Sequence, residues 1–202
     1  SGVGSTFSSY VIQKNKSNNS TIVLCSGKSY NLNLKGFTTL PKIITPESLS
    51  IINKFISFPL KSPITASGCI GNPKKEGEAK YKIYNTGSSM GSSDNLPGNS
   101  KYKKVVVYVS GNLLARYDDG KYGCSINSYA MKVNTKADGL RYVDIINKSK
   151  LIKLVFESCK YSGFNNILLM KNFPLIEGKS DEEIYRHFNL TQEEIDYVES
   201  YR

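Results

Sequence analysis

The chain has 202 residues, which is enough for one large domain or for one domain with part of another. Hydrophobic residues make up 39% of it, and its formal net charge is +10. No apolar run approaches the roughly 20 residues that cross a bilayer, and the polar opening 1–10 does not read as a signal peptide. We therefore expect no membrane partner and a cytoplasmic location, nucleoid-associated or in an equivalent viral factory. Because the opening Ser-Gly-Val-Gly lacks an initiator Met, we expect a piece of a longer protein.

Charge is divided unevenly along the chain. Residues 1–180 carry 25 Lys and Arg against 10 Asp and Glu, whereas residues 181–202 carry 2 against 7. A basic body that is also rich in Tyr is typical of proteins that bind a phosphate backbone.

The elements predicted in the first half are strands and one helix. A helix is expected from Thr45, a capping residue, with Pro46 at its first position and an end before Pro59. Strands are expected at 4–13 and 21–25, as a hairpin around the polar turn 14–20, and at 30–34 and 81–84.

The stretch 85–100 is dominated by Gly, Ser and Asn. Such a composition buries too little apolar area to order itself, so we expect a functional or disordered loop. Our hypothesis is that this loop orders on DNA. It contains a Gly-x-Ser-x-Gly pattern at 87–91, which we read as a chance match because His187, the only histidine, lies far away in the acidic tail.

The elements predicted in the second half begin with the strongest strand, at 105–109. Strands at 113–117 and 123–133 complete a β-meander, with Asp118 and Asp119 forming the turn before Gly120. A helix follows from about 139 and is broken near Ser149, and an apolar strand is expected at 167–170. The predicted fold class is α+β: a curved antiparallel sheet with flanking helices and a short C-terminal helical pair.

The acidic tail carries two capping boxes, Ser180 with Glu183 and Thr191 with Glu194. They predict two short helices. Because the acidic side chains of the second helix would repel phosphate, we expect the pair to be a structural cap and not a helix-turn-helix that reads DNA.

The cysteines and the single histidine give no metal-binding pattern. Cys25, Cys69, Cys124 and Cys159 lie 35 to 55 residues apart, without the short spacing of a zinc site. We expect four free thiols, no metal site, and a surface or helix-end position for His187.

Lysines and one arginine alternate with tyrosines through residues 74–122. Lys and Arg supply affinity for the backbone by releasing counterions, Tyr can stack on a base or bond a phosphate, and Arg116 could read guanine in the major groove. The candidate DNA contacts are Lys74, Lys75, Lys80, Lys101, Lys103, Lys104, Tyr108, Arg116, Tyr117, Lys121 and Tyr122. We expect no catalytic residue in this chain.

Several segments together resemble the TaqI-like (γ-class) N6-adenine DNA methyltransferases and fused restriction–modification enzymes. Residues 2–12 resemble the last hairpin of the catalytic domain, and 104–111, 117–123 and 147–152 resemble parts of the target-recognition domain. Segments 172–176 and 188–199 resemble the C-terminal end of such enzymes. The resemblance covers most of the chain, and the order of the segments is its strongest argument.

This resemblance implies a division of the chain. Residues 1–25 would be a hairpin remnant of the catalytic domain, 26–179 the DNA target-recognition domain, and 180–202 the acidic helical cap. It also implies sequence-specific recognition of double-stranded DNA for an adenine methyltransferase domain, present in cis or in trans.

Two motifs of the family are missing. The Asn/Asp-Pro-Pro-Tyr/Phe motif that holds the flipped adenine is absent, and Asn72-Pro73-Lys74-Lys75 does not replace it. The Gly-rich segment for S-adenosylmethionine is absent as well. We therefore expect no cofactor in this chain, S-adenosylmethionine in the parent enzyme, and no methyl transfer by the chain alone.

Two alternative functions remain open from the sequence. One is a metal-dependent nuclease that uses Glu78 and Lys80 with an acid such as Asp118. The other is a protein-interaction subunit of a larger complex, for which the basic surface would be incidental.

Overall fold

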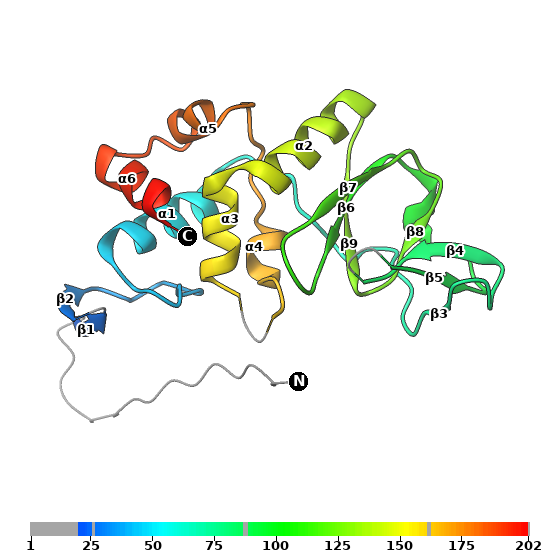
Figure 1. The fold of residues 1–202 in the computed structure, drawn as a ribbon, viewed down its shortest axis with the longest axis horizontal. Coiled ribbons are helices and arrows are strands. Elements are labelled where there is room, and N and C mark those ends of the chain that lie inside the picture. Colours follow the sequence, from blue (N-terminus) through cyan, green and yellow to red (C-terminus); the bar gives the residue numbers. More distant parts are fainter. Residues whose placement is uncertain (1–19, 26, 87–88, 161–162, 202) are drawn as a thin grey trace.

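The structure is a computed structural model that describes residues 20–25, 27–86, 89–160 and 163–201. Helices gather in one half of the molecule and most strands in the other, with helix α2 running along the junction (Figure 1). The chain is of the predicted α+β class, with open, curved sheets.

Helix α1 (Pro46–Ser57) begins where the capping pattern predicts. The Thr45 hydroxyl accepts a hydrogen bond from the Ser48 amide at 3.2 Å, and the Ser48 hydroxyl accepts one from the Thr45 amide at 2.9 Å. This reciprocal cap satisfies two backbone donors at the start of the helix.

The central sheet is antiparallel and has three strands in the order β7–β6–β9. Strand β6 (Lys104–Tyr108) is buried along its whole length, between β7 (Ala115–Asp118) and β9 (Ser128–Lys132). The predicted meander is wrong, because β9 returns to the free edge of β6 and the intervening strand joins another sheet.

The second sheet has four strands in the order β3–β5–β4–β8. They are β3 (Lys74–Lys75), β5 (Met90–Ser93), β4 (Tyr81–Tyr84) and β8 (Gly123–Cys124). The β4–β8 pair is parallel, so this second sheet is mixed.

A separate hairpin is formed by β1 (Thr21–Cys25) and β2 (Lys28–Leu32). The strand predicted at 21–25 is thus present and pairs with the strand that follows it. The partner predicted at 4–13 lies outside the described residues.

The described residues of the stretch 85–100, which are 85–86 and 89–100, contain regular structure where a functional or disordered loop was predicted, because polar contacts replace the missing apolar burial. The stretch holds strand β5 and a 3-10 helix, η1 (Gly98–Lys101). The fully buried Asn99 side chain accepts a hydrogen bond from the Cys124 amide at 2.9 Å and donates to the Ser67 carbonyl at 3.3 Å. The Ser92 hydroxyl donates to the Lys75 carbonyl.

The helices of the second half follow the predicted pattern with one exception. Helices α2 (Lys136–Lys148) and α3 (Lys150–Ser158) are separated at Ser149, as expected. The run predicted as a strand at 167–170 is instead helix α4 (Ile167–Lys171), because the Asn166 side chain caps it by accepting from the Leu168 amide at 2.9 Å. A short apolar run does not distinguish strand from helix by its periodicity.

The C-terminal tail forms the two predicted helices, α5 (Asp181–His187) and α6 (Gln192–Ser200), each with its capping box. They pack into the main core: the Phe188 ring lies 6.1 Å from that of Phe55, and Lys54 pairs with Glu194 at 2.6 Å. His187 ends α5, as expected, and its Nε2 hydrogen-bonds the Leu175 carbonyl oxygen at 3.0 Å.

The central sheet separates two apolar cores. Val105 and Val107 of β6 face the helices and join the main core. Val106 and Tyr108 face the opposite side and form a smaller core with Tyr84 and the buried Cys124 thiol. The strand half is therefore held to the helical half by both faces of β6.

Gly139 is required where α2 crosses the central sheet. A Cβ atom at this position would lie 2.6 Å from the Tyr117 ring carbon Cε2, which is closer than van der Waals contact permits. Replacing Gly by Ala inside a helix normally stabilises it by up to about 1 kcal/mol, whereas overpacking costs about 1–3 kcal/mol.

We therefore expect Gly139→Ala to lower the free energy of unfolding by about 1–2 kcal/mol, measured by urea denaturation. In a Tyr117→Ala background the same substitution should instead stabilise the protein. A stabilising effect in both backgrounds would contradict the close packing of α2 on β7.

Candidate nucleic-acid interface

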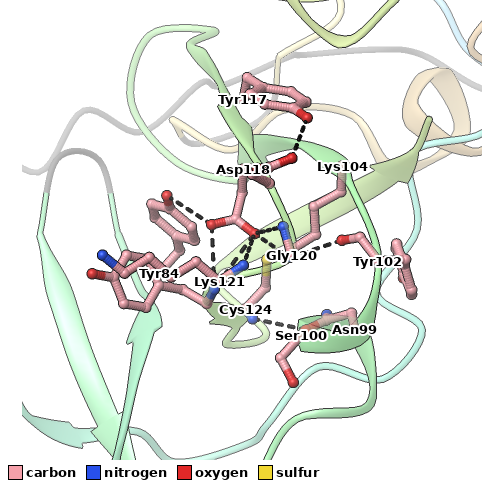
Figure 2. Close-up of polar contacts among 12 residues, drawn as sticks. Tyr84, Asn99, Ser100, Tyr102, Lys104, Tyr117, Asp118, Gly120, Lys121 and Cys124 are labelled. Carbon is pink, nitrogen blue, oxygen red and sulfur yellow. Dashed lines mark hydrogen bonds and ion pairs between the residues drawn. The ribbon is translucent and has the colours of Figure 1, made fainter. Parts of the chain in front are cut away.

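An ion pair buried between the two sheets organises the strand half. The Lys104 Nζ lies 2.7 Å from the Asp118 Oδ1, and their side chains are 0% and 2% exposed. The same carboxylate accepts a hydrogen bond from the Tyr84 hydroxyl at 3.2 Å (Figure 2). Burial, and next the charge of Asp118, raise the pKa of Tyr84, so its hydroxyl remains a donor.

Asp118 also shapes the turn that leads from β7 to β8. Its carboxylate accepts hydrogen bonds from the backbone amides of Gly120 at 2.9 Å, Lys121 at 3.0 Å and Tyr122 at 3.2 Å. The turn-forming role predicted for this residue is confirmed, and its ion pair with Lys104 is an addition that the sequence did not indicate. The carboxylate thus fixes the backbone of residues 120–122.

The turn presents Lys121 and Tyr122 beside β4. The Lys121 Nζ lies 5.1 Å from the centroid of the Tyr122 ring, and the Lys82 Nζ lies 5.9 Å from it. The Tyr122 ring meets the Tyr84 ring edge-on, with centroids 5.7 Å apart. Both lysines are exposed, so the ring supports two cations at the surface. We call Lys82, Lys121 and Tyr122 the turn cluster.

Lys82 was not among the predicted contacts. Strand alternation could have found it, because Lys82 lies within the strand predicted at 81–84, two residues after the predicted contact Lys80. Lys82 forms a partly exposed ion pair with Glu76, and the hydrogen bond between them raises the pKa of Lys82, so its ammonium stays charged.

A second group of cations surrounds Tyr102, just before β6. Lys101 and Lys103 flank it in the sequence and are both exposed. The Lys132 Nζ at the end of β9 lies 5.7 Å from the Tyr102 ring centroid. Lys132 was also missed, because its place beside this ring depends on the pairing of β9 with β6.

Arg116 lies on β7, two residues before Asp118 and on the same face of the sheet. Its side chain is exposed, and its guanidinium lies 5.9 Å from the centroid of the buried Tyr108 ring. A planar, exposed guanidinium can make the paired hydrogen bonds that guanine accepts.

Three predicted contacts are corrected by the structure. Lys104 and Tyr108 are 0% exposed, so neither side chain reaches a ligand at the surface. They face inward because alternate residues of β6 point into the smaller core. Tyr117 faces α2 on the other side of the sheet, and its hydroxyl donates to Asp119 at 2.8 Å.

The remaining predicted contacts are exposed but lie apart from the turn cluster. Lys74 and Lys75 are on the edge strand β3, which β5 and β4 separate from β8. Lys74 pairs with Asp94 at 2.6 Å. Lys80 lies before β4, with its Nζ 5.0 Å from the centroid of the Tyr81 ring.

The groups that the nuclease alternative needs are not assembled. Asp118 is occupied by Lys104 and the turn amides. In the part of the chain that the structure describes, there is no cluster of three or more His, Cys, Asp or Glu that could hold a metal ion. The hydroxyl of Ser89, the central residue of the Gly-x-Ser-x-Gly pattern, donates a hydrogen bond to the Thr86 carbonyl within a turn.

Within the described part of the chain, none of the four cysteines forms a disulfide. Burial raises the pKa of Cys69 to about 11 and that of Cys124 to about 12, so both remain neutral and weakly nucleophilic. Among the described residues, no helix is both long and apolar enough to cross a membrane.

Comparisons with protein-family models, with curated proteins and with solved structures found no match for this chain.

We expect Asp118→Asn to lower the free energy of unfolding by about 3–5 kcal/mol, because it leaves the Lys104 ammonium buried without an opposite charge. The matched control is Asp94→Asn, which breaks the exposed pair with Lys74 and should cost less than about 1 kcal/mol. Urea denaturation of both variants measures the difference. If both variants lost the same free energy of unfolding, burial of the Lys104–Asp118 pair would not affect stability.

Proposed function

We propose that this chain recognises double-stranded DNA in a sequence-specific manner. The observation that carries the proposal is the turn cluster, in which Lys82 and Lys121 lie over the Tyr122 ring on a backbone fixed by Asp118. Two ammonium groups held by one ring form a surface for phosphates, and their neutralisation by DNA would release counterions.

The packing of the tyrosines favours a duplex over a single strand. Single-strand binding requires aromatic faces that are free to stack on bases. The Tyr122 ring is held edge-on by Tyr84 and has two lysines near it, and the Tyr102 ring has the exposed Lys132 near it. These rings are suited to orienting cations toward a phosphate backbone.

In this proposal, Arg116 contacts a base of the duplex. It lies on the same face of β7 as the Asp118 side chain that shapes the turn, so the phosphate contacts and the guanidinium project from neighbouring positions of one rigid unit. Phosphate contacts set the register on the duplex and base contacts supply the sequence preference.

The biological role we propose is target recognition for an adenine-N6 methyltransferase or a restriction–modification enzyme whose catalytic part is not in this chain. This part of the proposal rests on the sequence resemblance. An enzyme that modifies a base must extrude it from the stack, and a separate basic unit that grips the duplex would hold the distorted DNA in place.

The turn cluster is tested by Lys82→Gln/Lys121→Gln. We expect weaker binding to a random duplex, and a plot of log K against log salt whose slope is smaller by about 1.8, because each phosphate contact contributes about 0.9. The control Lys28→Gln/Lys171→Gln removes the same charge from exposed positions on β2 and α4 and should leave the slope unchanged. If both double variants lose affinity equally, only net charge matters and the proposed interface is wrong.

Sequence preference is tested by selecting from a randomised duplex library at two salt concentrations. We expect the wild-type chain to enrich a short motif that persists at the higher salt. Arg116→Lys keeps the charge but loses the paired geometry, so it should lower discrimination at one base pair by about 1–3 kcal/mol. Uniform, salt-sensitive retention by the wild-type chain would reject sequence-specific recognition.

A further inference from the structure

A second basic site lies in the helical half, away from the turn cluster. It is a hollow of about 500 Å³ lined by Lys42, from the segment before α1, Leu113 from the β6–β7 turn, Lys150 and Lys153 on α3, and Tyr201 near the end of the chain. Helix α6 packs against α3 and brings the end of α6 close to the α3 lysines (Figure 1), and the Lys42 amide donates to the Ser158 carbonyl at the end of α3 at 2.8 Å. The volume is typical of small-molecule sites.

The lining of this hollow carries a net positive charge. Glu157, which also lines it, has both carboxylate oxygens 2.9 Å from the Lys160 Nζ, and Lys150 pairs with Glu199. Lys42 and Lys153 are exposed and have no ion-pair partner among the described residues. Three lysines and one glutamate thus line one concave site, and this net positive lining favours an anion.

The rest of the lining is apolar or able to donate hydrogen bonds. Leu113 and the half-buried Tyr201 ring form a wall. Burial raises the pKa of Tyr201, so its hydroxyl stays protonated and can donate to an anion. The Asn112 side chain adds an amide that can donate and accept. An apolar wall beside cations suits a ligand with a flat apolar body and a charged group.

We propose that this hollow, which we call the α3 pocket, binds a nucleoside monophosphate. The phosphate lies between Lys42 and Lys153, and the base lies against Leu113 and the Tyr201 ring. Charge-assisted hydrogen bonds from two lysines supply most of the affinity, and the apolar wall selects a nucleotide over a bare phosphate ion. The proposal does not depend on DNA binding by the turn cluster.

The test is calorimetric titration of the chain with AMP, adenosine and inorganic phosphate as probes. We expect saturable binding of AMP, and binding of adenosine or phosphate weaker by about tenfold or more, because each lacks one half of the recognised ligand. Lys42→Gln/Lys153→Gln should weaken AMP binding by about tenfold or more. Lys28→Gln/Lys171→Gln carries the same charge change outside the pocket and should bind AMP as the wild type does.

Three outcomes would overturn the proposal. AMP and inorganic phosphate binding equally well would indicate a simple anion site, and equal losses in both double variants would indicate a general charge effect. If AMP does not bind while Lys42→Gln/Lys153→Gln weakens duplex binding, the pocket is a contact for DNA phosphates. Circular dichroism of each variant verifies that its fold is intact. Loss of duplex binding through the turn cluster alone would leave the AMP result unaffected, so the two proposals fail separately.

Discussion

The buried pair of Lys104 and Asp118 is the constraint on which the strand half depends. An ionised carboxylate taken from water costs several kcal/mol unless its oxygens find donors. Here the donors come from three places: Lys104 on β6, the Tyr84 hydroxyl on β4, and the amides of the turn before β8. One side chain on β7 therefore joins the central sheet to the mixed sheet and determines the path of the chain between them.

This arrangement separates structural lysines from surface lysines. Lys104 has its charge neutralised inside the protein, whereas Lys82 and Lys121 lie outside over the Tyr122 ring. In the sequence all three are lysines within two residues of a tyrosine, in basic segments. The separation follows from the alternation of β6 and from the position of Asp118 opposite Lys104 in the β6–β7 pair. Fewer lysines are therefore exposed than the sequence indicates, and two of the exposed ones lie together at the Tyr122 ring.

Local patterns predicted the elements whose ends are set by their own side chains. The caps at Thr45 and in the tail, the helix break at Ser149 and the apolar run of β6 all lie where the sequence places them. The predictions that were wrong concern contacts between residues that are far apart in the sequence. Asn99 orders the stretch 85–100 through Cys124, and β9 pairs with β6 across an intervening strand. For the site, residue types indicated a basic, aromatic surface, but only the pairing of strands distinguishes exposed Arg116 from buried Lys104.

The contribution of the Lys104–Asp118 pair to the free energy of unfolding does not by itself account for the pair. A buried pair is often no more stabilising than apolar residues of the same volume, although removing one partner is costly. Stability of the smaller core alone therefore does not require Lys104 and Asp118. What apolar residues would not supply is an acceptor for the turn amides of Gly120, Lys121 and Tyr122. The pair's distinct contribution is therefore the turn geometry, which places Lys121 and the Tyr122 ring beside Lys82 of β4.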